Sequence, residues 1–249
     1  MTHEFRFSYF LLMLAALGTC SLLLRKTQEK LPLMWWQKLG IGVGAFCGAM
    51  IGAKLPFLLI DWNRFLDGSA WLSDGKTIMC GIIGGYFGVE LAKWTLDIRV
   101  KTGDTFAVPC AVAVAIGRVA CFVGGCCFGT PTNLPWGVVF QQSGDSLPRH
   151  PTQFYEAAFH LSIAGILLVL QQRELFRGQL IKFYILFYLA YRFVTEFIRP
   201  ETKLELGLTV YQWAALAMTP LFLFLWWKDA HENALASTGK IATIPEPPA

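Results

Sequence analysis

The chain has 249 residues, of which 55% are hydrophobic and 15% charged, with a net charge of +4 and a mean hydropathy of +0.47. This composition excludes an ordinary soluble domain, and apolar runs of transmembrane length predict an all-α, polytopic membrane protein. The basic residues lie in loops, so no nucleic-acid partner is expected. We predict a single transmembrane domain over residues 1–230 and a disordered cytoplasmic tail, rich in Pro, Glu and Ala, over 231–249.

Four helices are predicted in the first half of the chain, over about 7–24, 39–60, 77–96 and 106–127. The second contains Gly44, Gly48 and Gly52, and this spacing of four is typical of closely packed membrane helices. In the third, Glu90 and Lys93 are three residues apart, so we expect them to pair at the membrane interface.

The fourth helix carries Arg118 inside the apolar segment IGRVACFVGGCCFG, residues 116–129. A guanidinium cannot lose its proton, and at the centre of a bilayer it costs roughly 2.5–3.5 kcal/mol. Such a residue requires either a partner within the protein or a function.

The second half is predicted to contain a polar segment, 129–152, and helices over about 153–170, 180–198 and 208–227. Seven helices place the two termini on opposite sides of the membrane. With the N-terminus outside, ten lysines and arginines lie inside and six outside. Because basic residues favour the cytoplasmic side, we predict an external N-terminus and a cytoplasmic C-terminus.

This topology brings polar and thiol side chains from five helices to one depth near the outer surface. The predicted set is Cys80 from the third helix; Gly117, Arg118, Cys121 and Gly129 from the fourth and its end; His150, Gln153, Tyr155 and Glu156 around the start of the fifth; Tyr188, Arg192, Glu196 and Arg199 from the sixth; and Gln212 from the seventh. Since the planar fork of arginine suits phosphate or carboxylate, the set predicts an anion-binding site.

Structural interpretations of the same residues stay open at this point. Arg192 and Glu196 have the spacing of an internal salt bridge, and Glu156 is a possible partner for one arginine. Gln153 and Gln212 are possible interhelical hydrogen-bonding residues. The shared depth of the whole set favours a functional site.

Four motifs in this region resemble the prolipoprotein diacylglyceryl transferase family. Gly117, Arg118, Phe122 and Gly129 match its signature, and CGIIGG (80–85), RHPTQFYEA (149–157) and YLAYRFVTEFIRPE (188–201) match further family motifs in order. The resemblance implies transfer of a diacylglyceryl group from phosphatidylglycerol to the lipobox cysteine of prolipoproteins, releasing glycerol phosphate. It also implies an outer-leaflet site in the bacterial inner membrane, among membrane lipids, with no cofactor. Arg118 and Arg192 would hold the phosphate.

The chain departs from the family pattern at three positions. Cys80 replaces a histidine, Cys121 an asparagine and Cys126 an acidic residue. We therefore expect His150, the remaining histidine at the right depth, to act as the base. Two alternatives stay open, catalysis through the positive field of the arginines and a different reaction.

The cysteines leave two other function classes open. A membrane thiol–disulfide oxidoreductase is one, although the sequence has no Cys-x-x-Cys, and a non-enzymatic phospholipid carrier or scaffold is the other. No metal site is predicted, because the cysteines lack the usual ligand spacing.

Overall fold

The computed structural model describes residues 3–60 and 77–242, and within them the chain is almost entirely helical. The α-helices in this part are α1 (His3–Gln28), α2 (Trp35–Ile60), α5 (Ile78–Thr95), α6 (Gly103–Val123), α7 (Thr152–Gln172), α8 (Leu180–Thr195) and α9 (Val210–Ala242). Short 3-10 turns occur at Gln141–Ser143, Glu196–Ile198 and Glu205–Gly207. The antiparallel strands β1 (Val138–Val139) and β2 (Pro148–Arg149) form a small hairpin.

Five of these helices, α1, α2, α6, α7 and α9, contain segments long and apolar enough to cross a membrane. Helices α5 and α8 are shorter, at 18 and 16 residues, and run beside the others in the bundle. The prediction of an all-helical membrane protein is therefore confirmed.

Several predicted boundaries were wrong. Helix α6 ends at Val123, four residues before the predicted end, because Gly124 and Gly125 follow and Gly125 has a positive φ of 65°. Helix α8 ends at Thr195 and continues as the 3-10 turn. The polar segment contains the hairpin, which was not predicted.

The tail was also predicted incorrectly over part of its length. Helix α9 continues to Ala242, so residues 231–242, expected to be disordered, are helical. Residues 243–249 lie outside the described residues. The division at residue 230 stays a prediction.

Helices α2 and α5 make a close backbone contact through glycine, as the spacing in α2 predicted. A Cβ atom on Gly44 would lie 2.5 Å from the carbonyl oxygen of Gly88, and one on Gly48 would lie 2.8 Å from the Gly88 Cα. Helix α5 therefore contacts α2 through the glycine-rich face that includes Gly84 and Gly88. Small residues allow the two backbones to approach, which gives more van der Waals contact per turn.

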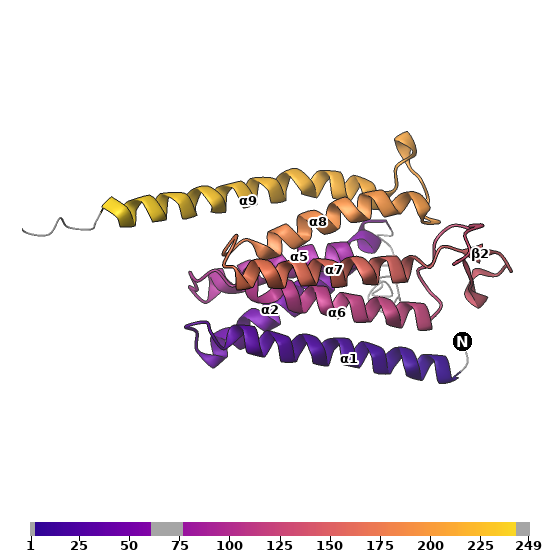
Figure 1. Cartoon of the computed structure of the whole chain (residues 1–249), viewed down its shortest axis with the longest axis horizontal. Coiled ribbons are helices and arrows are strands. Elements are labelled where there is room, and N and C mark those ends of the chain that lie inside the picture. Colours follow the sequence, from indigo (N-terminus) through magenta and orange to yellow (C-terminus); the bar gives the residue numbers. More distant parts are fainter. Residues whose placement is uncertain (1–2, 61–76, 243–249) are drawn as a thin grey trace, which may run out of the picture.

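The bundle has two ends that differ in their connections (Figure 1). One end holds the N-terminus, the hairpin and the connection between α8 and α9, and we name it the hairpin end. The opposite end holds the α7–α8 connection and the C-terminal part of α9. Helix α1 packs on α6, α6 on α7 and α8, and α8 on α9. Polar side chains from the centre of the sequence therefore meet inside the bundle.

Candidate functional site

Glu156, on the first turns of α7, is the centre of a buried polar cluster at the hairpin end. Its Oε2 lies 2.5 Å from Nη2 of Arg118 on α6 and 3.8 Å from Nη2 of Arg199. Its Oε1 accepts a hydrogen bond of 2.5 Å from the hydroxyl of Tyr188 on α8, and His160 Nε2 lies 3.9 Å away. All five residues are buried. One carboxylate thus joins three helices and the segment after α8, and we name this group with the Arg192–Glu196 pair the arginine–glutamate cluster.

Arg192 and Glu196 form the second ion pair of the cluster, with Nη2 2.8 Å from Oε2. Glu196 Oε1 also accepts a hydrogen bond of 3.1 Å from the Thr209 hydroxyl, and the Arg192 guanidinium lies 5.0 Å from the centre of the Tyr211 ring. The internal salt bridge left open by the sequence is therefore present. Arg118 pairs with Glu156 and Arg192 with Glu196, and sequence spacing did not reveal the first of these pairs.

The two glutamines of the predicted set both bond to backbone carbonyls of other elements. Gln212 on α9 donates from Nε2 to the carbonyl of Phe193 on α8, at 3.2 Å. Gln153 on α7 donates from Nε2 to the carbonyl of Cys126, at 2.6 Å. The interhelical interpretation is thus confirmed for Gln212, whereas Gln153 holds the turn that follows α6.

That turn is fixed from several directions. The carbonyl of Cys127 accepts hydrogen bonds from Arg199 Nη1 at 2.5 Å and from the Thr152 hydroxyl at 2.7 Å. Two residues further on, a Cβ on Gly129 would lie 2.7 Å from the Cβ of His150. Glycine is required at this position because the two backbones approach so closely. The cluster therefore positions the turn as well as the helices.

Three cysteines come together at this turn. The sulfurs of Cys121, Cys126 and Cys127 all lie within 4.8 Å of one another, and none of the three is in a disulfide. Cys121 is half-buried on the last turn of α6, while Cys126 and Cys127 are exposed. The sequence placed them near the site but did not predict this contact, because the early end of α6 and the reversal of the chain decide it.

The histidines were assigned incompletely from the sequence. His150 is half-buried beside the hairpin, and its Nδ1 lies 3.3 Å from the hydroxyl of Tyr155. His160, fully buried, belongs to the arginine–glutamate cluster and its Nδ1 lies 2.9 Å from the hydroxyl of Tyr184. His150 is thus not the only histidine near the site, and the spacing of four between Glu156 and His160, which places both on one face of α7, already indicated this.

Two residues of the predicted set lie at the edge of this arrangement. The nearest atom to a Cβ on Gly117 would be Met13 Sδ, 4.0 Å away on α1, so this glycine faces α1 and not the cluster. Cys80 is half-buried on the first turn of α5, where it packs against the hydrophobic core. Gly117 therefore contributes to helix packing.

The cluster has more positive than negative groups. Arg118, Arg192 and Arg199 face the two carboxylates, so one positive charge is left over when both are ionised. Among the described residues, the buried Nε of Arg118 has no hydrogen-bond partner. A buried charge without compensation is costly, so this arrangement favours the binding of an anion.

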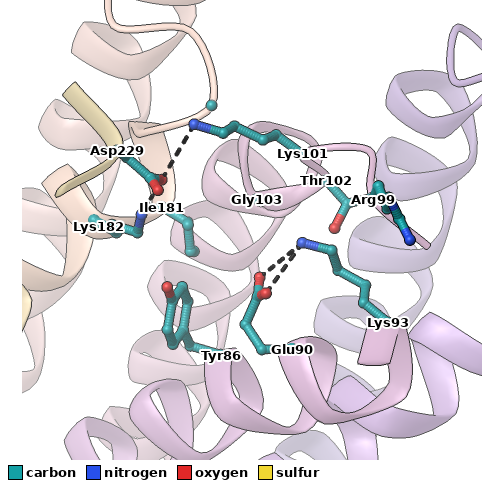
Figure 2. Close-up of a pocket in the computed structure, with 11 residues that line it drawn as sticks. Tyr86, Glu90, Lys93, Arg99, Lys101, Thr102, Gly103, Ile181, Lys182 and Asp229 are labelled. Atoms are coloured by element: carbon teal, nitrogen blue, oxygen red, sulfur yellow. Dashed lines mark hydrogen bonds and ion pairs between the residues drawn. The ribbon is translucent and has the colours of Figure 1, made fainter. Parts of the chain in front are cut away.

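A second polar region lies at the opposite end, around a pocket of about 160 Å³ (Figure 2). Lys93 Nζ lies 3.1 Å from Glu90 on α5, which confirms their predicted pairing. Asp229 on α9 contacts Lys182 on α8, and Lys101 Nζ lies 3.7 Å away. Asp229 thus connects α9 with α8 and with the α5–α6 connection, while the Glu90–Lys93 pair lies within α5.

These features define a polytopic helical membrane protein with a buried, positively charged cluster at one end of its bundle. The profile of the prolipoprotein diacylglyceryl transferase family matches residues 5–228, and the chain belongs to this family.

Curated relatives agree with the family match. Phosphatidylglycerol–prolipoprotein diacylglyceryl transferase of Clostridium tetani is 33% identical over 164 residues, covering 63% of this chain and 66% of the relative. The protein of the same name from the Wolbachia of Brugia malayi is 34% identical over 185 residues, covering 70% and 68%. That of Bordetella bronchiseptica is 35% identical over 191 residues, covering 69% and 70%. The chain thus aligns with about two thirds of the length of each of these relatives.

Proposed function

We propose that this protein transfers a diacylglyceryl group from phosphatidylglycerol to the lipobox cysteine of prolipoproteins and releases glycerol phosphate. The observation that carries this proposal is the buried arginine–glutamate cluster, built around the arginine of the segment 116–129 in a chain that belongs to the transferase family. The donor carries a phosphodiester anion at headgroup depth, which is the kind of ligand that the excess positive charge favours.

Arg118 and Arg192 are the residues we assign to the phosphate. In the transfer, the acceptor sulfur attacks the glycerol carbon, the carbon–oxygen bond to phosphate breaks, and its electron pair goes to the phosphate oxygen. Guanidinium groups aimed at that oxygen stabilise the charge that develops there. Glu156 and Glu196 hold the two guanidiniums in place, since each forms an ion pair with one of them.

The acceptor thiol has to lose its proton before it attacks, because its unperturbed pKa is about 8.5. We propose that His150 accepts this proton, since it is half-buried beside the turn that carries the cysteines. His160 is fully buried against Glu156 and Tyr184, so we assign it to positioning Glu156. Cys80 is a poor substitute for a histidine base, since a thiol on a membrane helix is hard to ionise.

The proposal includes a bacterial inner-membrane location, seven membrane spans, an external N-terminus and a site in the outer leaflet. Its support is that α1 begins at the hairpin end, while the last turn of α1 and the connections at the opposite end contain Arg25, Lys26, Arg99, Lys101, Arg173 and Arg177. Reporter fusions in the connections 129–151 and 173–179 test it. We expect an external signal from the first and a cytoplasmic signal from the second, and the reverse pattern would contradict the outer-leaflet site.

The decisive experiment for the activity is lipid transfer by purified protein. Vesicles containing phosphatidylglycerol with labelled acyl chains are incubated with a lipobox peptide, and a peptide with serine in place of the cysteine is the matched control. We expect labelled peptide and free glycerol phosphate with the cysteine peptide only. Lipid binding without any transfer would favour the carrier, and thiol oxidation without transfer would favour the oxidoreductase.

A further inference from the structure

The three thiols at the end of α6 have the geometry of an incomplete tetrahedral metal site. Zinc–sulfur bonds of about 2.3 Å in a tetrahedron place the sulfurs roughly 3.8 Å apart. The sulfurs of Cys121, Cys126 and Cys127 are already within 4.8 Å of one another, so an approach of about 1 Å closes the site. Side-chain rotation in two exposed cysteines and one half-buried cysteine supplies such a movement.

The turn that presents the thiols is held in an unfavourable conformation. Cys127 has a φ of +63°, in the left-handed region, and such a backbone costs of order 1–3 kcal/mol for a residue other than glycine. Three hydrogen bonds to the carbonyls of Cys126 and Cys127, donated by Gln153, Thr152 and Arg199, hold it. Strain that the surroundings maintain in this way is common at ligand-binding sites.

The three cysteines offer three ligands to a metal ion and leave a fourth coordination position open. In the part of the chain that the structure describes, no further His, Cys, Asp or Glu completes the group. Zinc sites with three protein ligands typically take water or a substrate at the fourth position. Three thiolates around a divalent cation carry one net negative charge, and the guanidinium of Arg199, which bonds to the carbonyl of Cys127, supplies a positive charge beside them.

We propose that Cys121, Cys126 and Cys127 bind one thiophilic divalent cation of the zinc class, and that the acceptor thiol takes its fourth position. The second part rests on the proposed function. It gives this chain a way to ionise the acceptor although Cys80 stands where the family pattern has a histidine. The cation lies at the turn that Arg199 of the arginine–glutamate cluster and Gln153 hold by hydrogen bonds.

In this proposal the acceptor thiol reacts while it is bound to the cation. The cation binds the acceptor sulfur and lowers the pKa of its thiol, whose proton passes to His150 and from there to water. The metal-bound thiolate attacks the glycerol carbon of phosphatidylglycerol, and a sulfur–carbon bond forms. The carbon–oxygen bond to phosphate breaks, and the electron pair leaves with glycerol phosphate. The thioether product is a weaker ligand than a thiolate, so it dissociates.

Metal binding is tested without the reaction. Protein purified under reductant is washed with chelator and titrated with Co²⁺, whose thiolate complexes absorb visibly in tetrahedral sites. We expect one Co²⁺ per chain, displaced by one Zn²⁺. Cys121→Ser should weaken binding by more than the roughly 10–100-fold caused by losing an outer-shell partner, whereas Cys47→Ser, an exposed cysteine on α2, should bind normally.

Folding of each variant is checked by thermal unfolding in detergent. If Cys121→Ser does not fold, the metal titration of the wild-type protein tests the proposal by itself. Reduced wild-type protein that binds no Co²⁺ or Zn²⁺ would overturn the metal site. That result leaves the proposed function intact, because lipid transfer is measured separately.

The acceptor position is tested by adding lipobox peptide to the Co²⁺ protein. We expect the cysteine peptide to change the cobalt absorption and the serine peptide to leave it unchanged, and chelator-washed enzyme to transfer lipid at least about 10²-fold more slowly until Zn²⁺ is restored. Full transfer by metal-free enzyme would overturn the acceptor role. Metal binding with no transfer under any condition would instead contradict the proposed function and leave the metal site standing.

Discussion

Two polar regions lie at opposite ends of the helical bundle, and they differ in their cations and in how deeply the charged groups are buried. At the hairpin end, Arg118, Arg192 and Arg199 face the carboxylates of Glu156 and Glu196. At the opposite end, lysines pair with Glu90 and Asp229 around a pocket. The arginines and glutamates of the first region are all buried, whereas in the second region, drawn in Figure 2, Lys101 is exposed and Glu90 is half-buried.

We interpret the first region as a binding site and the second as an anchoring contact. A guanidinium stays charged and offers a planar fork, so arginines held in the membrane region favour a bidentate anion. A lysine carries its charge on a flexible stem and reaches water at a helix end. We therefore expect changes at the hairpin end to affect lipid transfer, and changes at the opposite end to affect stability alone.

The largest expected effect is that of Arg118→Lys on lipid transfer. An ammonium cannot reproduce the two parallel hydrogen bonds of the fork, so we expect the rate to fall by about 10²–10³-fold, as for loss of one transition-state donor. The matched control is Lys182→Arg at the opposite end, which should keep wild-type transfer. Full activity in Arg118→Lys would contradict the assignment of Arg118 to the phosphate.

The second prediction compares the central carboxylates of the two regions. Glu156→Gln leaves buried Arg118 without its partner, which should lower the free energy of unfolding by about 3–5 kcal/mol. Asp229→Asn leaves Lys182 beside the pocket and still bonded to the carbonyl of Leu225. We therefore expect it to lower the free energy of unfolding by only about 1–3 kcal/mol. Denaturant unfolding in detergent measures both. Equal losses would mean that the two regions are equivalent anchors.

The third prediction separates the two histidines of the hairpin end. His150→Ala should lower turnover by roughly 10²-fold or more while donor lipid still binds, because a general base contributes about 10²–10⁴-fold. Raising the pH should restore part of the rate, since the acceptor thiol then ionises without help.

His160→Ala is the control for this pair. It leaves the buried Tyr184 hydroxyl unpaired, so it should cost about 1–3 kcal/mol of stability, and a rise in pH should not restore any lost rate. The two roles would have to be exchanged if His160→Ala lost turnover that high pH restored and His150→Ala kept wild-type turnover.

The smallest expected effect concerns the exposed pair in the hairpin connection. A hydrogen bond of 2.6 Å from Arg149 lowers the pKa of Asp145 below its usual value. A carboxyl group with a lowered folded-state pKa stabilises the fold above its unfolded pKa of about 3.9, and this stability is lost as the pH falls through the folded value.

Asp145→Asn should therefore lower the melting temperature slightly at pH 7 and by less at pH 3. A difference of the same size at both values would show that charge is not the cause. A loss as large as that of Glu156→Gln would place this exposed pair in the same class as the buried cluster.

The sequence by itself determined the class of protein and the list of residues that carry its chemistry. Long apolar runs predict membrane helices because burial in lipid needs little more than length and composition. The glycine spacing in α2 and the pairing of Glu90 with Lys93 were also readable, since both depend on local helical periodicity. Arg118 was conspicuous because a charge in an apolar run is costly wherever the helix packs.

Only the tertiary structure decided which of these residues meet. The pairing of Arg118 with Glu156 depends on how α6 and α7 rotate against each other, and the contact of three thiols depends on where α6 ends. The membership of His160 in the cluster, and the turning of Gly117 towards α1, follow from the same rotations. A sequence carries helical periodicity directly, but the rotation and depth of one helix against another arise from packing of the whole bundle.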